Sequence, residues 1–255
     1  MPAIYAHYRF GKQLLPHMPP DVRQCIQRFR RMYDMGLQGP DFFLYYNPFG
    51  KTAVGDLAHV FHSQSGQEFF TRVCAAVDSE AAQAYLYGLL GHYCLDSVCH
   101  PYINRMDALG EVRHMLLEAE FDRFLLAKDK LLPPHTQDLS RYIRLTRGEC
   151  MTVAAFYPPA TGGNVNLCVK NMALLHKLGA DKNRTRTEKL LKKLKPGLCN
   201  GLIPEEAVTA FARMDSELLA RYNRAVKQYP LLLQQMLEHM RTGCALGEAF
   251  ASDFG

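Results

Sequence analysis

The 255-residue sequence lacks the features that would place it in a membrane, in a disulfide-rich fold or among cysteine-rich metal ribbons. No window approaches the roughly 18 consecutive apolar residues of a membrane-spanning helix. The start, MPAIYAHYRFGKQLL, has no basic segment followed by an apolar run and a cleavage site. The eight cysteines include no CxxC pair. These absences predict a cytoplasmic protein with reduced thiols.

The sequence also has no tryptophan and little excess charge. Its 30 Lys and Arg residues oppose 25 Asp and Glu residues, and a net charge of +5 does not by itself indicate nucleic-acid binding. With 48% hydrophobic residues, a chain of this length can bury a substantial core. The composition is that of an ordinary globular protein.

Strand patterns are missing as well, because no segment alternates polar and apolar residues between hairpin turns. Apolar residues instead recur every three or four positions over residues 57–76, 78–99 and 109–128, which predicts helices. The stretch PPDVRQCIQRFRRMYDMGLQGPD lies between prolines and glycines and is expected to form one more helix. The sequence therefore predicts an all-α fold, a compact multi-helix bundle in a single domain, 1–255.

One predicted helix carries three ligand-type side chains at four-residue spacing. The stretch GHYCLDSVCHPYI contains His92, Asp96 and His100, and residues four apart lie on one face of a helix. Pro101 disfavours helical geometry at His100. We therefore expect the helix to end there, which would leave the His100 imidazole free to turn toward a second site.

A second pair, His114 and Glu118, has the same spacing in the next helix. A single histidine in an apolar helix is more often a hydrogen-bonded core residue, and one such pair is common. Further ligand-type residues precede these pairs, namely His7, Asp41, His59 and His62. Burying them all without a metal would leave many polar groups to satisfy. Because imidazole and carboxylate suit zinc in open catalytic sites, the pattern favours a metal cluster between helices.

The sequence resembles the zinc-dependent phospholipase C family, which is related to the zinc-dependent single-strand nucleases. The resemblance covers residues 1–125, the half that carries the ligand-type residues. It rests on IYAHYRFG, GLQGPDFFLYY, FHSQSGQEFF, YLYGLLGHYCLDSVCHPYI and HMLLEAEFD, which occur in the family's order. Residues 126–255 contain no motif that we can match and are expected to form a helical remainder.

The resemblance implies a zinc ligand set. One zinc is held by Asp41, His62, His92 and Asp96, a second by His100, His114 and Glu118, and a third by His7 with Asp96 as a bridge. His62 has the better spacing to the phenylalanines that follow it, and His59 is the alternative. Secreted members complete the third site with an N-terminal tryptophan, which this sequence lacks. The resemblance thus implies two zinc ions and leaves the third open.

The function implied by the resemblance is phosphodiester hydrolysis by a metal-bound hydroxide, with Asp41 orienting or deprotonating the water. The substrate would be a phospholipid headgroup or a small phosphodiester. The alternatives are cleavage of single-stranded nucleic acid, and a helical protein without catalysis that binds another macromolecule. No obligate protein partner is indicated. The aromatic run DFFLYY beside Asp41 would either form a rim for lipid chains or bases, or pack in the core.

The stretch DKNRTRTEKLLKKLKPG, residues 181–197, concentrates seven Lys and Arg residues. Such a run is usually a solvated helix face or loop. The alternative is transient contact with a membrane surface, through anionic lipid, or with nucleic-acid phosphates.

Overall fold

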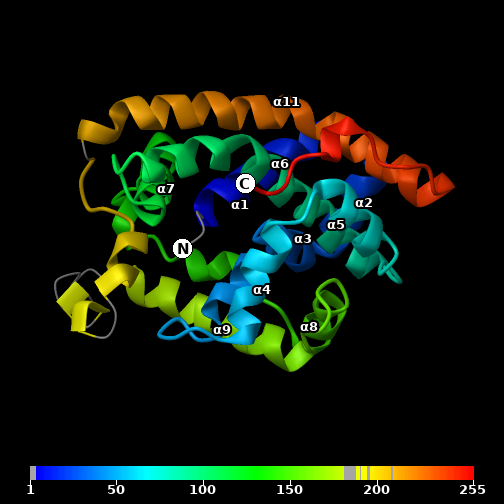
Figure 1. Cartoon of the computed structure of the whole chain (residues 1–255), viewed down its shortest axis with the longest axis horizontal. Helices are drawn as coiled ribbons and strands as arrows, with labels where there is room; N and C mark the ends of the chain where they lie inside the picture. The colour runs from blue at the N-terminus through cyan, green and yellow to red at the C-terminus, as the bar shows by residue number, and fades with distance from the viewer. Residues whose placement is uncertain (1–3, 181–187, 190, 194–195, 208) are drawn as a thin grey trace.

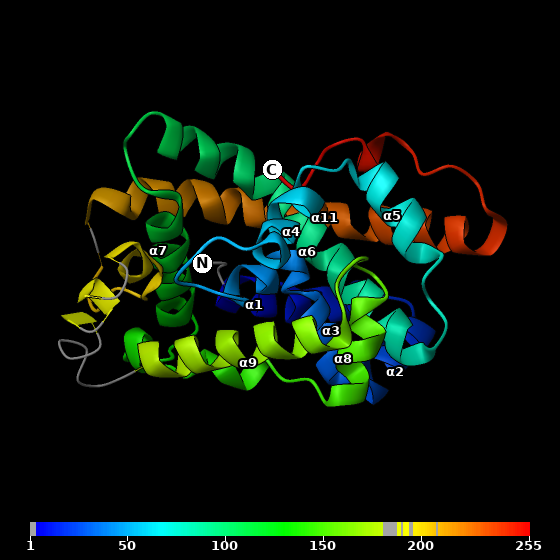
Figure 2. The same ribbon diagram turned by 60° about the horizontal axis from the view of Figure 1, so that its bottom comes forward.

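The computed structural model describes residues 4–180, 188–189, 191–193, 196–207 and 209–255. Within these ranges every regular element is an α-helix or a 3₁₀-helix, so the predicted all-α fold is confirmed. Helix α11 (Ala212–Thr242) runs along one long edge of the molecule and α9 (Gly162–Gly179) along the opposite edge (Figure 1). Helix α7 (His114–Lys128) stands across the space between them (Figure 2). None of the described helices is long and apolar enough to cross a membrane.

The centre of the fold is α6 (Glu80–Ala108), a helix of 29 residues. It packs against α3 (Arg30–Gly36) at a contact so close that a Cβ on Gly36 or Gly88 would overlap the opposing backbone. Elsewhere α6 packs along α11, where the Tyr229 hydroxyl donates a hydrogen bond of 3.1 Å to the carbonyl oxygen of Tyr87. The ligand-bearing helix is therefore held by elements from both halves of the chain.

The stretch expected to form one helix after the first prolines folds as two helices, α2 (Pro20–Arg28) and α3. Phe29 separates them with φ −119° and ψ 45°, outside the helical region. Both helices pack against α6. The break at Phe29 corrects the prediction, because the change of direction lets each short helix contact the central one.

The predicted helix over 57–76 is also divided, into α4 (Ala53–His62) and α5 (Gly66–Cys74). Ser65 begins the second helix, since its side chain accepts a hydrogen bond from the backbone N–H of Glu68. Such a cap stabilises a helix start by about 1 kcal/mol. The division leaves His62 as the last residue of α4.

Helix α6 does not end at His100 as the sequence suggested, and it continues through Pro101 to Ala108. An interior proline costs about 3 kcal/mol because it removes a backbone hydrogen bond. The turns that follow bury Ile103 and Met106, and burying two such side chains offsets this cost. His100 therefore reaches its neighbours from within a continuous helix.

The remaining elements complete the core and its surface. They are α1 (Ile4–Leu14), η1 (Leu15–His17), η2 (Gly39–Tyr45), η3 (Pro134–Thr136), η4 (Leu139–Tyr142), α8 (Arg147–Ala154), η5 (Pro196–Gly201), η6 (Thr209–Phe211) and η7 (Glu248–Phe250). Phe42, Phe43 and Tyr45 of η2 are buried in the core. Of the two roles expected for the aromatic run DFFLYY, these three residues therefore have the core-packing one. Six cysteines, Cys25, Cys74, Cys94, Cys99, Cys150 and Cys168, are buried free thiols. Much of the basic segment, 181–187, 190 and 194–195, lies outside the described residues.

Candidate metal centre

Five elements bring ligand-type side chains to one place in the molecule. They are α1 with His7, η2 with Asp41, α4 with His62, α6 with His92, Asp96 and His100, and α7 with His114 and Glu118. Every residue of the predicted ligand set thus lies in this cluster except His59, the alternative to His62, which is exposed.

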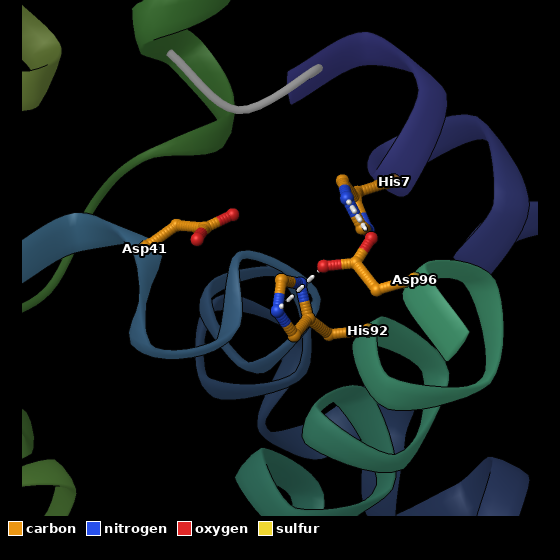
Figure 3. Close-up of side chains that lie close together, drawn as sticks. All are labelled: His7, Asp41, His92 and Asp96. Atoms are coloured by element: carbon orange, nitrogen blue, oxygen red, sulfur yellow. Dashed lines mark ion pairs between the residues drawn. The ribbon is translucent and has the colours of Figure 1, made fainter. Parts of the chain in front are cut away.

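Asp96 lies at the centre of the cluster, with its side chain 3% exposed. Its Oδ1 is 3.2 Å from His7 Nε2 and 3.7 Å from His100 Nε2. Its Oδ2 is 3.1 Å from His92 Nε2 and 3.7 Å from His62 Nε2. Figure 3 shows the Asp96 carboxylate between His7 and His92, with the Asp41 carboxylate pointing toward them from η2. This is the arrangement of a carboxylate shared between neighbouring sites.

A first group consists of His7, Asp41, His92 and Asp96, whose ligand atoms all lie within 4.8 Å of one another. His62 adjoins this group, because its Nε2 lies 3.1 Å from Asp41 Oδ1 and 3.4 Å from His92 Nε2. The other ring nitrogen of His62, Nδ1, is 2.7 Å from the carbonyl oxygen of Ala58. That contact turns Nε2 toward the carboxylates and leaves it free to bind a metal.

A second group consists of His100, His114 and Glu118, whose ligand atoms also lie within 4.8 Å of one another. Glu118 Oε1 is 3.4 Å from His100 Nε2 and 3.3 Å from His114 Nε2. His114 Nδ1 lies 3.0 Å from Asn104 Oδ1, which orients the ring. His114 is the most exposed of the three, so this group has a side that faces solvent.

The carboxylates of the cluster are ionised, but its imidazoles differ in protonation. Burial alone would lower the pKa of His7, His62 and His100, yet the neighbouring carboxylates raise it, so a cation would displace protons from these rings. Burial alone would raise the pKa of Asp96, but the imidazoles of His100, His92 and His7 hold it well below its usual value. Burial lowers the pKa of His92 to about 4, so this ring is neutral near pH 7. Asp41 is also buried, yet the His62 imidazole keeps its pKa below the ordinary value. Carboxylates that stay ionised beside a neutral imidazole are the forms that bind a divalent cation.

Zinc fits the residues that meet here. Asp96 Oδ2 is buried, and its neighbours are imidazole nitrogens of His92 at 3.1 Å and His62 at 3.7 Å. Burying three carboxylates among imidazoles is costly unless their charge is balanced, and a cation among these groups would balance it. The cluster combines five imidazoles with three carboxylates. Zinc binds such nitrogen and oxygen ligands, whereas magnesium and calcium prefer sites made of oxygen ligands alone.

One supporting residue continues a spacing that is visible in the sequence. Asp122 follows Glu118 by the same four residues that separate His114 from Glu118. Its carboxylate accepts hydrogen bonds of 3.0 Å and 2.8 Å from the backbone N–H groups of Tyr5 and Ala6. Asp122 thereby fixes the first turn of α1, which carries His7. The repeated four-residue spacing from His114 through Glu118 to Asp122 is the sequence signal that could identify this residue.

Other supporting contacts join residues far apart in the chain. Gly39 has φ +51°, and a Cβ there would overlap the His92 ring, so η2 can approach this ligand only with glycine at that position. The Tyr45 hydroxyl lies 2.8 Å from His176 Nε2, and the Asn171 amide donates to the Tyr45 carbonyl. Helix α9 thus holds η2, which carries Asp41. No local pattern in the sequence indicates these contacts.

Comparison with known families agrees with this geometry. A family model described as zinc dependent phospholipase C matches residues 6–156. The match covers more than half of the chain, includes all eight clustered residues, and continues beyond the 1–125 segment that carries the recognised motifs. No curated protein and no solved structure matches the chain.

Proposed function

The chain belongs to the zinc-dependent phospholipase C family, and from this we propose that it is a zinc-dependent phosphodiesterase that cleaves a phospholipid headgroup or a small phosphodiester. The observation that carries the proposal is the convergence of five imidazoles and three carboxylates from five separate elements. A purely structural core does not need this many ionisable groups in contact.

Two zinc ions, and a third at His7, account for all of the clustered residues. Asp41, His62, His92 and Asp96 would hold one ion, while His100, His114 and Glu118 would hold another. His7 would share Asp96 with the third, which is consistent with its 3.2 Å distance from that carboxylate. When bound, zinc would lower the pKa of a bound water and offset the negative charge that builds up on the phosphoryl oxygens.

Asp41 is the residue that we assign to the water that attacks phosphorus. Its side chain is 10% exposed, against 3% for Asp96, so it is the more accessible of these two carboxylates. The depressed pKa keeps it ionised near pH 7, with a lone pair that can accept a proton or orient a water molecule. His62 and the α9 contact to η2 fix its direction.

The surface of α9 supports contact with a phospholipid layer. This helix contains no Asp or Glu, and its outer face exposes Leu167, Leu174 and Leu178 together with Lys170 and Lys177. Exposed leucines flanked by lysines are typical of helices that lie on anionic membranes. Helix α9 also contacts η2, the element that carries Asp41, so a lipid layer against α9 would lie on the side of the molecule that holds η2. The basic segment 181–197 continues directly from this helix in the sequence.

The membrane contact predicts that Leu174→Glu combined with Leu178→Glu reduces sedimentation with phosphatidylserine vesicles severalfold. Hydrolysis of a soluble phosphodiester should be unchanged, because neither residue is in the metal cluster. If the double variant sediments like the unmodified protein, the proposed membrane contact of α9 is wrong, whereas the proposed metal centre is not affected by this result. Leu231→Glu, an equally exposed leucine on α11, is the matched control.

The proposed activity is tested by assaying zinc-loaded protein on a chromogenic phosphocholine ester, a bis-aryl phosphodiester and single-stranded DNA. We expect turnover of one or both esters with two to three zinc ions per chain, and loss of turnover after chelation. Asp41→Asn should lose turnover while the rest of the cluster still binds zinc. Turnover of DNA alone would favour the nuclease alternative. Protein that binds no zinc, or that binds zinc and turns over none of the three, would leave the non-catalytic binding protein as the better account.

A further inference from the structure

The last residues of the chain return to the metal cluster. After α11 ends at Thr242, the C-terminal segment, residues 243–255, runs back toward α5 and α6, as the red trace in Figure 1 shows. The carbonyl oxygen of Ser252 accepts hydrogen bonds of 2.8 Å from the Gly66 N–H and 3.1 Å from the Tyr93 hydroxyl. The segment is therefore fixed at the junction between α4 and α5, beside His62.

Phe254 of this segment touches two of the candidate ligands. Its backbone N–H donates a 3.2 Å hydrogen bond to the carbonyl oxygen of His62. Its ring centroid lies 5.4 Å from that of His62 and 5.8 Å from that of His92. The side chain is fully buried. Phe254 is thus in contact with the backbone and the ring of one ligand and with the ring of another.

The two histidines are held differently, because the His62 ring is oriented by its Nδ1 contact with the Ala58 carbonyl oxygen, whereas the His92 ring has no such contact. His62 is the last residue of α4, where carbonyl groups lack a partner within the helix, and Phe254 supplies one. His92 Nδ1 is buried and has no hydrogen-bond partner. Metal-binding histidines are usually held by a hydrogen bond at the second ring nitrogen. Because His92 lacks that bond, its ring direction depends on packing, which is supplied by the backbone of Gly39, by the rings of His7 at 4.7 Å and His62 at 5.5 Å, and by Phe254.

We propose that Phe254 is a positioning residue of the metal centre, which holds the His92 ring, and the end of α4 that carries His62, in the direction that binds metal. The inference rests on the proposed function, because it assumes that these histidines are ligands. It extends the centre beyond residues 6–156, the range in which the family match lies. A segment that sequence motifs assign no role then becomes part of the site.

The chain offers a matched control in Phe250, four residues earlier. This side chain is also fully buried and belongs to the same segment. Its ring stacks on Tyr93 at 5.7 Å and lies 5.4 Å from Phe70, and its described ring contacts include no histidine. Phe250→Leu and Phe254→Leu remove equal volume from the same packing region. A difference between them at the metal therefore reports the histidine contacts rather than general loosening of the segment.

The experiment measures metal binding by the full-length chain and its variants. Zinc affinity is obtained by competition with a chromophoric chelator, and Co²⁺ serves as a second probe because its visible absorption reports ligand geometry. We expect Phe254→Leu to weaken zinc binding about tenfold, at the low end of what supporting residues contribute, and to shift the Co²⁺ spectrum. Phe250→Leu should lower the thermal midpoint by a similar amount, with metal affinity and spectrum close to those of the unmodified protein.

Equal affinities and identical Co²⁺ spectra for the two leucine variants would overturn the inference. If Phe254→Leu does not fold, Phe254→Met retains the backbone bond and most of the volume, and it should show a smaller change in the same direction. Unmodified protein that binds neither zinc nor Co²⁺ would refute the proposed function and this inference together. Unmodified protein that binds both metals, with variants that match each other, refutes the inference alone.

Discussion

At the scale of single residues, Asp96 decides whether the cluster is a metal centre. The Asp96→Asn substitution keeps the side-chain volume but removes the charge that four imidazoles surround. We expect the variant to fold, to bind less zinc and to lose phosphodiester hydrolysis, because a neutral amide does not offset the charge of neighbouring cations. Circular dichroism, elemental analysis and the ester assay measure the three outcomes. Full zinc content with normal turnover would mean that Asp96 is a structural carboxylate.

A second residue-scale prediction separates His62 from His59. His62 lies against Asp41 and His92, whereas His59, one turn earlier in α4, is exposed. His62→Ala should lose zinc and activity, while His59→Ala should lose little of either. Zinc titrations of the two variants provide the comparison, and each serves as the other's control. The reverse pattern would move the ligand assignment to His59.

The sequence could predict residues that share a helix, because spacing alone places them together. His92, Asp96 and His100 are one turn apart, and so are His114 and Glu118. The sequence could not predict Phe254 beside His62 or His176 beside Tyr45. More than a hundred residues of sequence separate the two members of each pair. Contacts between such distant parts of the sequence follow from the packing of whole helices rather than from local periodicity.

At the scale of elements, the helix type was predictable and several helix ends were not. Apolar periodicity correctly indicated helices around 78–99 and 109–128. It could not show that burial beyond Pro101 keeps α6 helical, or that Phe29 and Ser65 divide two predicted helices. Each of these outcomes depends on tertiary packing or on a single backbone hydrogen bond. Apolar periodicity is averaged over many residues, so it detects neither the tertiary packing nor the single hydrogen bond that sets a helix end.

The contact between α7 and α11 gives an element-scale prediction about pH. Arg123 forms an ion pair with the fully buried Glu120, with a 2.9 Å bond from Nε, and Asp215 of α11 lies buried beside them. The Arg123 guanidinium hydrogen-bonds to Glu120, whereas Asp215 Oδ1 is buried without a hydrogen-bond partner. Burial, with a further effect of the Glu120 charge, raises the pKa of Asp215 to about 7 from an ordinary 3.8. The folded protein therefore binds this proton more tightly than the unfolded chain does.

Because the folded pKa lies above the unfolded value, Asp215 reduces stability progressively as the pH rises from about 4 to about 7. We expect Asp215→Asn to be more stable than the unmodified protein by roughly 1–3 kcal/mol at pH 8, with little difference near pH 4.5. Urea unfolding at the two pH values measures this. Glu238→Gln, an exposed position on the same helix, is the control. An Asn variant that is less stable at pH 8 would show that Asp215 is ionised and favourably paired.

At the scale of the whole molecule, the family match and the physical core do not coincide. The match ends at residue 156, yet the partners of the ligand-bearing elements lie beyond it. Helix α6 packs along α11, which buries Tyr229 and Met236 completely, and Cys94 Sγ of α6 donates to the Ala225 carbonyl. Helix α9 holds η2 through Asn171. The candidate metal centre is therefore built from one half of the sequence and supported by both.

This organisation predicts that residues 1–156 do not form a metal-binding unit alone. Without α11 and α9, an apolar face of α6 and the support of η2 would be open to water, and the lost burial would exceed the net stability of an ordinary domain. We expect the 1–156 fragment to lack a cooperative thermal transition and to bind zinc weakly, as measured by near-ultraviolet circular dichroism and chelator competition. Adding the 157–255 fragment should restore both properties in part, because the missing surfaces are then supplied in trans. A 1–156 fragment that unfolds cooperatively and binds zinc like the full-length chain would instead show that the matched region is an independent domain, and the support assigned to α9, α11 and the C-terminal segment would then be dispensable.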